Sequence, residues 1–108
     1  MNLLEETVKV LADNGKSLSD IIAVQGNDFG ISIDEFIQLA SETNYDNGYG
    51  TQEVATDLII IGKDWWLERA EYDGAEWWKF KQFPQIKSNI KSVSQLANGY
   101  YSSLKQLN

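Results

Sequence analysis

Carboxylates are the most abundant side chains in this 108-residue chain that could take part in acid or base chemistry, with sixteen Asp and Glu residues in all. Two carboxylates whose environments separate their pKa values can divide the acid and base roles of hydrolysis between them. The sequence alone places no two of them at the separation this chemistry needs. Glu68, Glu71 and Glu76 fall on an expected hairpin, where we interpret them as surface charge. A carboxylate-based hydrolase is therefore the weakest of three functional hypotheses.

Other enzyme chemistries are limited by composition, because the chain has no Cys and no His. Disulfides, thiolate nucleophiles, imidazole catalysis and the standard zinc sites all need one of these residue types. Residues 44–50 superficially resemble a calcium loop, but the sixth and twelfth positions of such a loop, which need Gly and Glu, would be Tyr49 and Ala55. We therefore assign no catalytic, cofactor-binding or metal-binding residues and expect a protein that is not an enzyme.

Four tryptophans, in the adjacent pairs Trp65-Trp66 and Trp77-Trp78, are a more unusual feature. Neighbouring strand residues face opposite sides, so at most one member of each pair can enter a single core. If helices cover only one face, Trp66 and Trp77 stay partly exposed on the other, as aromatic residues of binding surfaces do. Helices on both faces, or a dimer of the chain, would instead give them a structural role. The candidate partner surface consists of Trp66, Trp77, Tyr72, Tyr45 and Tyr49.

The elements that would position these residues are strands, and the clearest signal is the dipeptide Asp73-Gly74 between two alternating aromatic runs. A two-residue loop there pairs Tyr72 with Ala75. Counting back along both strands places Arg69 opposite Trp78 on one face of the hairpin. The same register sets Glu71 directly opposite Glu76, a like-charge contact that Arg69 or Lys81 would have to compensate.

Upstream, a Gly62-Lys63 loop would pair Ile61 with Asp64 and bring Leu58 beside Leu67. Both hairpins then agree on one apolar face. We expect the core face to hold Leu58, Ile60, Trp65, Leu67, Trp78 and Phe80.

Two helices are expected before these strands. Residues 3–14 have Leu4, Val8 and Leu11 at helical spacing, and a capping box from Ser32 to Glu35 begins a helix that runs to about residue 43. Segment 17–25 is ambiguous, because residues 17–20 could cap a short helix while residues 21–24 favour a strand. We favour the strand.

A long amphipathic helix is predicted after Pro84, and it would pack on the sheet or on another chain. Gly99 weakens it and could end it early. Its apolar positions are Ile86, Ile90, Val93, Ala97, Tyr100 and Leu104. The whole chain, residues 1–108, is thus expected to form one α+β domain. In it, a three- to four-stranded antiparallel meander packs with two N-terminal helices and the long C-terminal helix.

Charge is distributed unevenly. Residues 1–76 hold all sixteen acids and four basic residues, a net charge of −12, whereas residues 77–108 hold five lysines and no acid. This distribution argues against direct binding of nucleic acid. It also suggests a second hypothesis, in which the acidic surface imitates a phosphate backbone and inhibits a nucleic-acid-binding defence protein of the host.

The longest apolar run, residues 58–61, is far shorter than the ~20 residues that span a bilayer. The opening residues lack the basic and apolar regions of a signal peptide. We therefore expect a cytoplasmic protein that does not associate with membranes.

Two strings carry a resemblance: Tyr-Asp-Asn-Gly-Tyr-Gly at 45–50 and Glu-Tyr-Asp-Gly-x-Glu-Trp-Trp at 71–78. Here the chain resembles an uncharacterised family of small proteins from phages and prophages of low-GC Gram-positive bacteria, over about residues 20–84. The resemblance implies a phage-derived protein in the cytoplasm of a bacterial host, and it supplies no site residues. The leading hypothesis is a non-enzymatic phage accessory protein that binds a partner protein.

Overall fold

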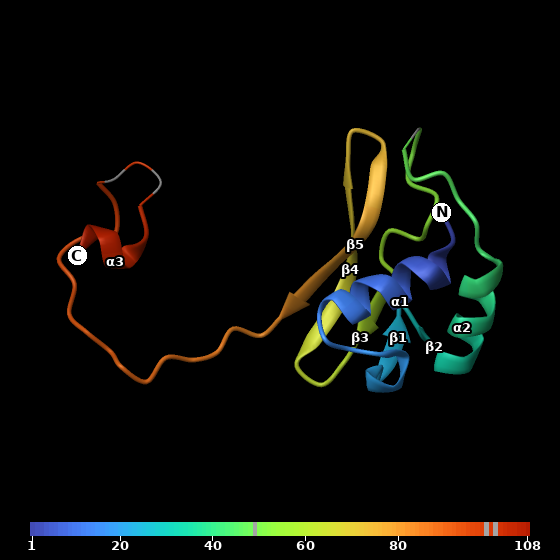
Figure 1. Cartoon of the computed structure of the whole chain (residues 1–108), viewed down its shortest axis with the longest axis horizontal. Coiled ribbons are helices and arrows are strands. Elements are labelled where there is room, and N and C mark those ends of the chain that lie inside the picture. The colour runs from blue at the N-terminus through green and yellow to red at the C-terminus, as the bar shows by residue number, and fades with distance from the viewer. Residues whose placement is uncertain (49, 99, 101) are drawn as a thin grey trace.

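The computed structural model describes residues 1–48, 50–98, 100 and 102–108. Within these residues the chain has an α+β fold, with five antiparallel strands in the order β2-β1-β3-β4-β5 and with α1 and α2 packed together on one face of the sheet (Figure 1). The elements are α1 (Leu3–Asp13), the 3-10 helix η1 (Leu18–Asp20), β1 (Ala23–Gln25), β2 (Gly30–Ile31), α2 (Ile33–Glu42), β3 (Ile59–Ile61), β4 (Trp65–Tyr72), β5 (Ala75–Gln82) and α3 (Leu104–Leu107).

The long hairpin of β4 and β5 has the predicted register. Tyr72 pairs with Ala75 and Arg69 pairs with Trp78. The turn residues Asp73 and Gly74 both have positive φ, at 51° and 89°. This is the backbone of the two-residue turn that matches the twist of antiparallel strands, and it explains why an Asp-Gly pair is found there.

The register predicted between β3 and β4 is wrong by two residues. Ile61 pairs with Trp66, not with Asp64, and the turn is formed by Lys63 and Asp64. Gly62 donates its N–H to the Trp65 carbonyl at 2.8 Å, and a Cβ on Gly62 would lie 2.0 Å from the Trp65 indole. Gly62 is therefore needed opposite Trp65 and not within the turn. A shift of two residues leaves every side chain on its expected face.

The ambiguous segment 17–25 contains both of the structures considered for it. Ser17 and Asp20 form the capping box of η1, and β1 follows and pairs with β3 as a fourth strand. The fifth strand, β2, was not predicted, because its two residues are too few to show alternation.

Helices α1 and α2 begin at the expected positions, with Asn2 and Ser32 as their N-caps. The buried stripe of α1 differs by one position from the predicted one, since Thr7 is fully buried while Val8 is 45% exposed. The reason is polar: the Thr7 hydroxyl accepts a hydrogen bond from the buried Trp78 indole at 2.9 Å.

The core lies between the two helices and the facing side of the sheet. Its buried apolar residues are Leu3, Leu11, Ile21, Val24, Phe36, Ala40, Tyr45, Val54, Ile60, Trp65, Leu67 and Trp78. Leu58 and Phe80, both expected in the core, are partly buried against it.

The predicted long C-terminal helix is wrong. Between Phe83 and Ser103, no described residue is helical, and the chain leaves the sheet as the extended segment drawn in orange in Figure 1 before α3. Ile86 and Ile90 are 93% and 91% exposed. An amphipathic stripe stabilises a helix mainly by packing, and at these two positions almost no packing is gained. In the described part of the chain, no helix is long and apolar enough to cross a membrane.

Candidate functional site

Strand alternation divides the four tryptophans between the two faces of the sheet, as the sequence predicted. Trp65 and Trp78 enter the core and are 3% and 4% exposed. Trp66 and Trp77 lie on the opposite face, where Trp66 is half-buried and Trp77 is 40% exposed. We call this side, which faces away from α1 and α2, the outer face. From the strand pairing it carries Ile59, Ile61, Trp66, Glu68, Ala70, Trp77, Lys79 and Lys81.

Trp66 is held in place by its neighbours on the outer face. Its indole N–H donates to the Glu68 carboxylate at 3.3 Å, and Lys81 pairs with the same carboxylate at 3.3 Å. Phe83, just beyond β5 and 71% exposed, meets the Trp66 ring edge-on at 5.6 Å between centroids. The result is an ordered aromatic patch next to charged groups.

The other three predicted surface residues are placed differently from one another. Tyr72 is 76% exposed, at the end of β4 beside the hairpin turn. Tyr45 is 7% exposed and belongs to the core, so its side chain is not available to a partner. Tyr49 lies outside the described residues. The structure therefore keeps Trp66, Trp77 and Tyr72 on the surface.

Tyr45 is buried because its hydroxyl has polar partners inside the fold. It donates a short hydrogen bond to the Glu6 carboxylate and accepts one from Arg69 Nη2 at 3.2 Å. Burial and the bond to Glu6 raise the pKa of Tyr45 to about 12, because both favour the neutral phenol.

Arg69 lies at the centre of this buried polar cluster, with no exposed side-chain surface. Its Nη2 donates to Glu76 Oε1 at 2.7 Å and its Nη1 to Glu6 Oε2 at 3.3 Å. The guanidinium also lies 4.7 Å from the centre of the Trp78 ring. Burial opposes its charge, but the hydrogen bonds that Arg69 donates to Tyr45 and Glu76, together with the charge of Glu6, outweigh that effect, so the pKa of Arg69 is raised.

Glu76, which the sequence led us to expect as surface charge, is buried instead. Its side chain is 1% exposed. Besides Arg69, its carboxylate accepts the backbone N–H groups of Glu53 at 2.7 Å and Val54 at 3.4 Å. It therefore ties the segment between α2 and β3 to the hairpin. Arg69 does compensate the Glu71–Glu76 pairing, as the register required.

A shallow depression of about 500 Å³ beside this segment is lined in part by Asp46 and Glu53. Glu53 accepts the Asp46 N–H at 2.8 Å, and Asp46 accepts the Gly48 N–H at 3.0 Å. Both carboxylates therefore stabilise the backbone of this loop. Within the described residues, no group of three or more Asp and Glu is arranged to hold a metal ion.

Comparisons with protein-family models, with curated proteins and with solved structures found no match for the chain.

Proposed function

We propose that this protein is a non-enzymatic protein-binding module and that its outer face contacts the partner. The observation that carries the proposal is the position of Trp66 and Trp77 on a sheet face that α1 and α2 leave uncovered. Tryptophan and tyrosine are enriched among interface hot spots, and polar groups surround them at the rim of the interface.

The order of the patch supports the same proposal. Trp66 is fixed by Glu68 and Phe83 before any partner arrives, so little side-chain entropy is lost on binding. A rigid sheet face can also present Trp77 and Tyr72 in one fixed arrangement, since both lie on the same long hairpin. Both properties lower the entropic cost of binding.

The biological setting is proposed from the sequence resemblance. The string at 71–78 contains Tyr72 and Trp77, and it resembles phage and prophage proteins of Gram-positive bacteria. We propose an accessory role in the cytoplasm of such a host, with a host or phage protein as the partner.

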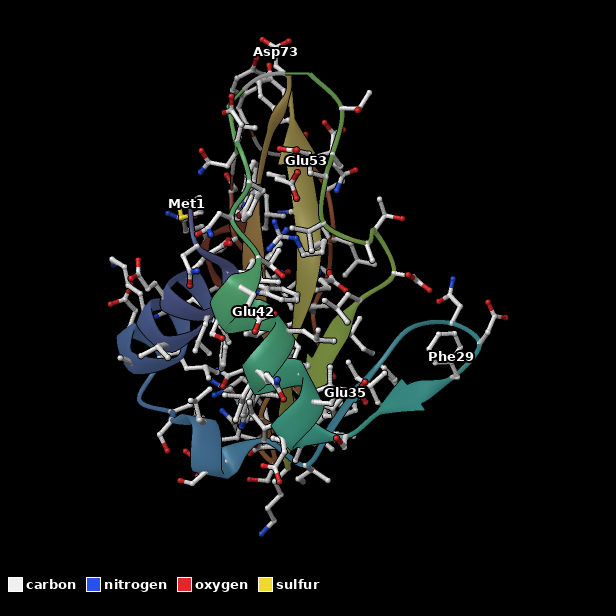
Figure 2. All side chains as sticks on the ribbon, turned by 90° about the vertical axis from the view of Figure 1, so that its right-hand side faces the viewer. Met1, Phe29, Glu35, Glu42, Glu53 and Asp73 are labelled. Atoms are coloured by element: carbon white, nitrogen blue, oxygen red, sulfur yellow. The ribbon has the colours of Figure 1, made fainter. Side chains whose placement is uncertain are left out.

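An affinity capture with matched variants tests this function. Trp77→Ser removes an aromatic side chain from the outer face, and Phe29→Ser removes another exposed one, 73% exposed, from the turn between β1 and β2 (Figure 2). Loss of a hot-spot tryptophan costs about 2 kcal/mol or more, which is at least about thirtyfold in affinity. A partner captured by the wild type and by Phe29→Ser should be lost with Trp77→Ser. Equal capture by all three proteins would reject the outer face.

Charge mimicry is the second candidate, and one observation favours it. Glu35, Glu42, Glu53 and Asp73 lie on one side of the molecule, from α2 to the tip of the hairpin (Figure 2). Residues 1–82 carry a net charge of −10. A partner that binds this acidic side should lose affinity steeply as the salt concentration rises to about 0.5 M, where the Debye length falls below roughly 5 Å. It should also be displaced by DNA, whereas a partner of the outer face should respond to neither.

A further inference from the structure

β5 lies at one edge of the sheet and continues into the extended segment drawn in orange (Figure 1). Along an antiparallel strand, the backbone N–H groups point alternately to one neighbour and to the other side. Phe83, just after β5, donates its N–H to the Asp64 carbonyl at 2.9 Å, towards β4. Trp78 donates in the opposite direction, to Glu6 Oε2 on α1 at 3.0 Å. Every second residue of β5 therefore points its N–H outward, in the direction that Trp78 does.

The chain covers this outer edge only along the first part of β5. Glu76, which also points outward, donates its N–H to the Asn47 carbonyl at 3.1 Å, in the segment between α2 and β3. Phe80 and Gln82 follow the same alternation, but no described residue accepts a hydrogen bond from either N–H. The edge over residues 78–82 is therefore open to a further strand.

We propose that residues 78–82 of β5 bind an extended segment of the partner protein as an added strand, and that this segment alternates acidic and apolar side chains. Strand addition of this kind gains affinity from backbone hydrogen bonds and selectivity from alternate side chains. The inference rests on the protein-binding function proposed above and names the chemistry of the partner, because the added strand borders the outer face.

The lysines of β5 determine the acidic half of this pattern. Lys79 and Lys81 both lie on the outer face, and Lys79 is exposed. Glu68 is directly opposite Lys79 in the register but pairs with Lys81 at 3.3 Å, so Lys79 has no ion pair with a described residue. In an added strand, the two residues on either side of the one opposite Phe80 lie beside these lysines. Cross-strand pairs of opposite charge are favourable, so acids are preferred there.

The ring of Phe80 determines the apolar half. Phe80 is partly buried against the core and stacks on Trp65 at 5.8 Å between ring centroids, on the side of the sheet that faces the helices. Residues directly opposite each other in neighbouring strands share a face, so an apolar side chain opposite Phe80 covers more of its ring. The favoured partner sequence is therefore acid, apolar, acid at three consecutive positions.

Charge also argues against this chain's own segments as the occupant. Antiparallel pairing of two copies of β5 about Phe80 sets Lys79 opposite Lys81, a like-charge contact. Residues 83–108 contain no acid, so they lack the pattern as well. Lysines on an edge strand thus hinder self-association and leave the edge available to a strand with carboxylates.

The acidity of the whole chain does not prevent this contact. Residues 77–108 hold five lysines and no acid, so the charge near the open edge is positive. Exposed charges more than about 8 Å away are largely screened at physiological salt.

A peptide titration of the full chain, followed by NMR, tests the inference. The probe is a short capped peptide in which Glu and Val alternate, and its control has Lys in place of Glu. At saturation with the Glu peptide, the amide hydrogens of Phe80 and Gln82 should exchange at least about tenfold more slowly. Those of Lys79 and Lys81, which point towards β4, should not change. The Lys peptide should leave all four unaffected.

Two matched pairs of variants locate the contact. Gln82→Pro removes an outward N–H, which an edge strand tolerates, whereas Gln82→Ala keeps it. The proline variant should bind the Glu peptide about fivefold more weakly, because one hydrogen bond is lost, and the alanine variant should bind it like the wild type. Lys79→Glu should weaken binding about threefold or more. Lys105→Glu makes the same charge change on α3 and should have no effect.

Several results would overturn strand addition. The Glu peptide could fail to slow exchange at Phe80 and Gln82, or the Lys peptide could bind equally well. Slowed exchange that appears without peptide as the protein concentration rises would assign the edge to a second copy of the chain. Equal binding by each variant and its control would also contradict the contact.

The inference and the proposed function fail separately. If Trp77→Ser abolishes capture of a partner while the Glu peptide does not bind, the outer face remains a binding surface and strand addition is rejected. If the Glu peptide binds as described while Trp77→Ser leaves capture unchanged, the open edge stands and the outer face is rejected.

Discussion

Replacing Arg69 with methionine tests whether the buried polar cluster holds the fold together. Methionine keeps most of the apolar stem of the side chain and removes the guanidinium, which bonds Glu76 at 2.7 Å, Glu6 at 3.3 Å and Tyr45 at 3.2 Å. Glu76, 1% exposed, would keep only the N–H groups of Glu53 and Val54 as donors. A buried carboxylate would thus lose its counter-charge.

Breaking a buried ion pair by removing one partner typically costs about 3–5 kcal/mol, because the remaining charge is left in a low-dielectric environment. We expect Arg69→Met to lower the free energy of unfolding by that amount, a large share of the roughly 5–15 kcal/mol that stabilises a domain. The further change Glu76→Gln removes the stranded charge. The double variant should therefore be about 1–3 kcal/mol more stable than the sum of the two single effects predicts.

Urea unfolding followed by tryptophan fluorescence measures these energies. The matched control is Lys9→Met, because Lys9 pairs with Asp13 at the similar distance of 2.8 Å but is 76% exposed. That surface pair should be worth less than about 1 kcal/mol. If Arg69→Met cost no more than Lys9→Met, or if the Arg69 and Glu76 effects were additive, the cluster would not have the role assigned to it.

Three further predictions follow from the buried contacts. The pKa of Tyr45 is raised from an ordinary 10 to about 12, so the stability that the neutral phenol contributes is complete below pH 10 and is lost as the pH rises towards 12. Tyr45→Phe should therefore flatten this part of the curve of unfolding free energy against pH. An unchanged curve would contradict the prediction. Thr7→Val leaves the Trp78 indole N–H, now bonded at 2.9 Å, without its acceptor and should cost about 1–3 kcal/mol in chemical denaturation. Gly62→Ala would place a Cβ 2.0 Å from the Trp65 indole, so a loss of about 1–3 kcal/mol or more is expected, and a variant as stable as the wild type would show that the turn can open.

The hairpin could be predicted from sequence because its signals are local. Asp73-Gly74 determines the turn, and alternation then assigns every residue of β4 and β5 to a face, including Arg69 to the core side. The buried partners of Arg69 could not be predicted, since Glu6 lies 63 positions away and comes near only when α1 packs on β5. One signal for such partners was present in the sequence: an arginine on the core face of a strand must be paired with buried anions.

In the C-terminal segment, by contrast, the local pattern led to a wrong prediction. Its spacing predicts a helix, but periodicity states only which side of a helix would be apolar. Whether the helix forms depends on a surface that receives Ile86 and Ile90, and the sequence pattern does not contain that surface. Tyr45 shows the same limit of local patterns. Its place in a polar loop favoured exposure, but contacts with Glu6 and Arg69, which are distant in the sequence, bury it.

Site-specific photo-crosslinking in cells of the proposed bacterial host tests the central claim most directly. A photoreactive phenylalanine analogue would be placed at position 77 on the outer face, at position 29 on the β1–β2 turn and at position 42 on the acidic side. Binding through the outer face predicts a discrete crosslinked partner from position 77 and none from positions 29 or 42. A partner trapped from position 42 but not from position 77 would contradict the account and would favour charge mimicry.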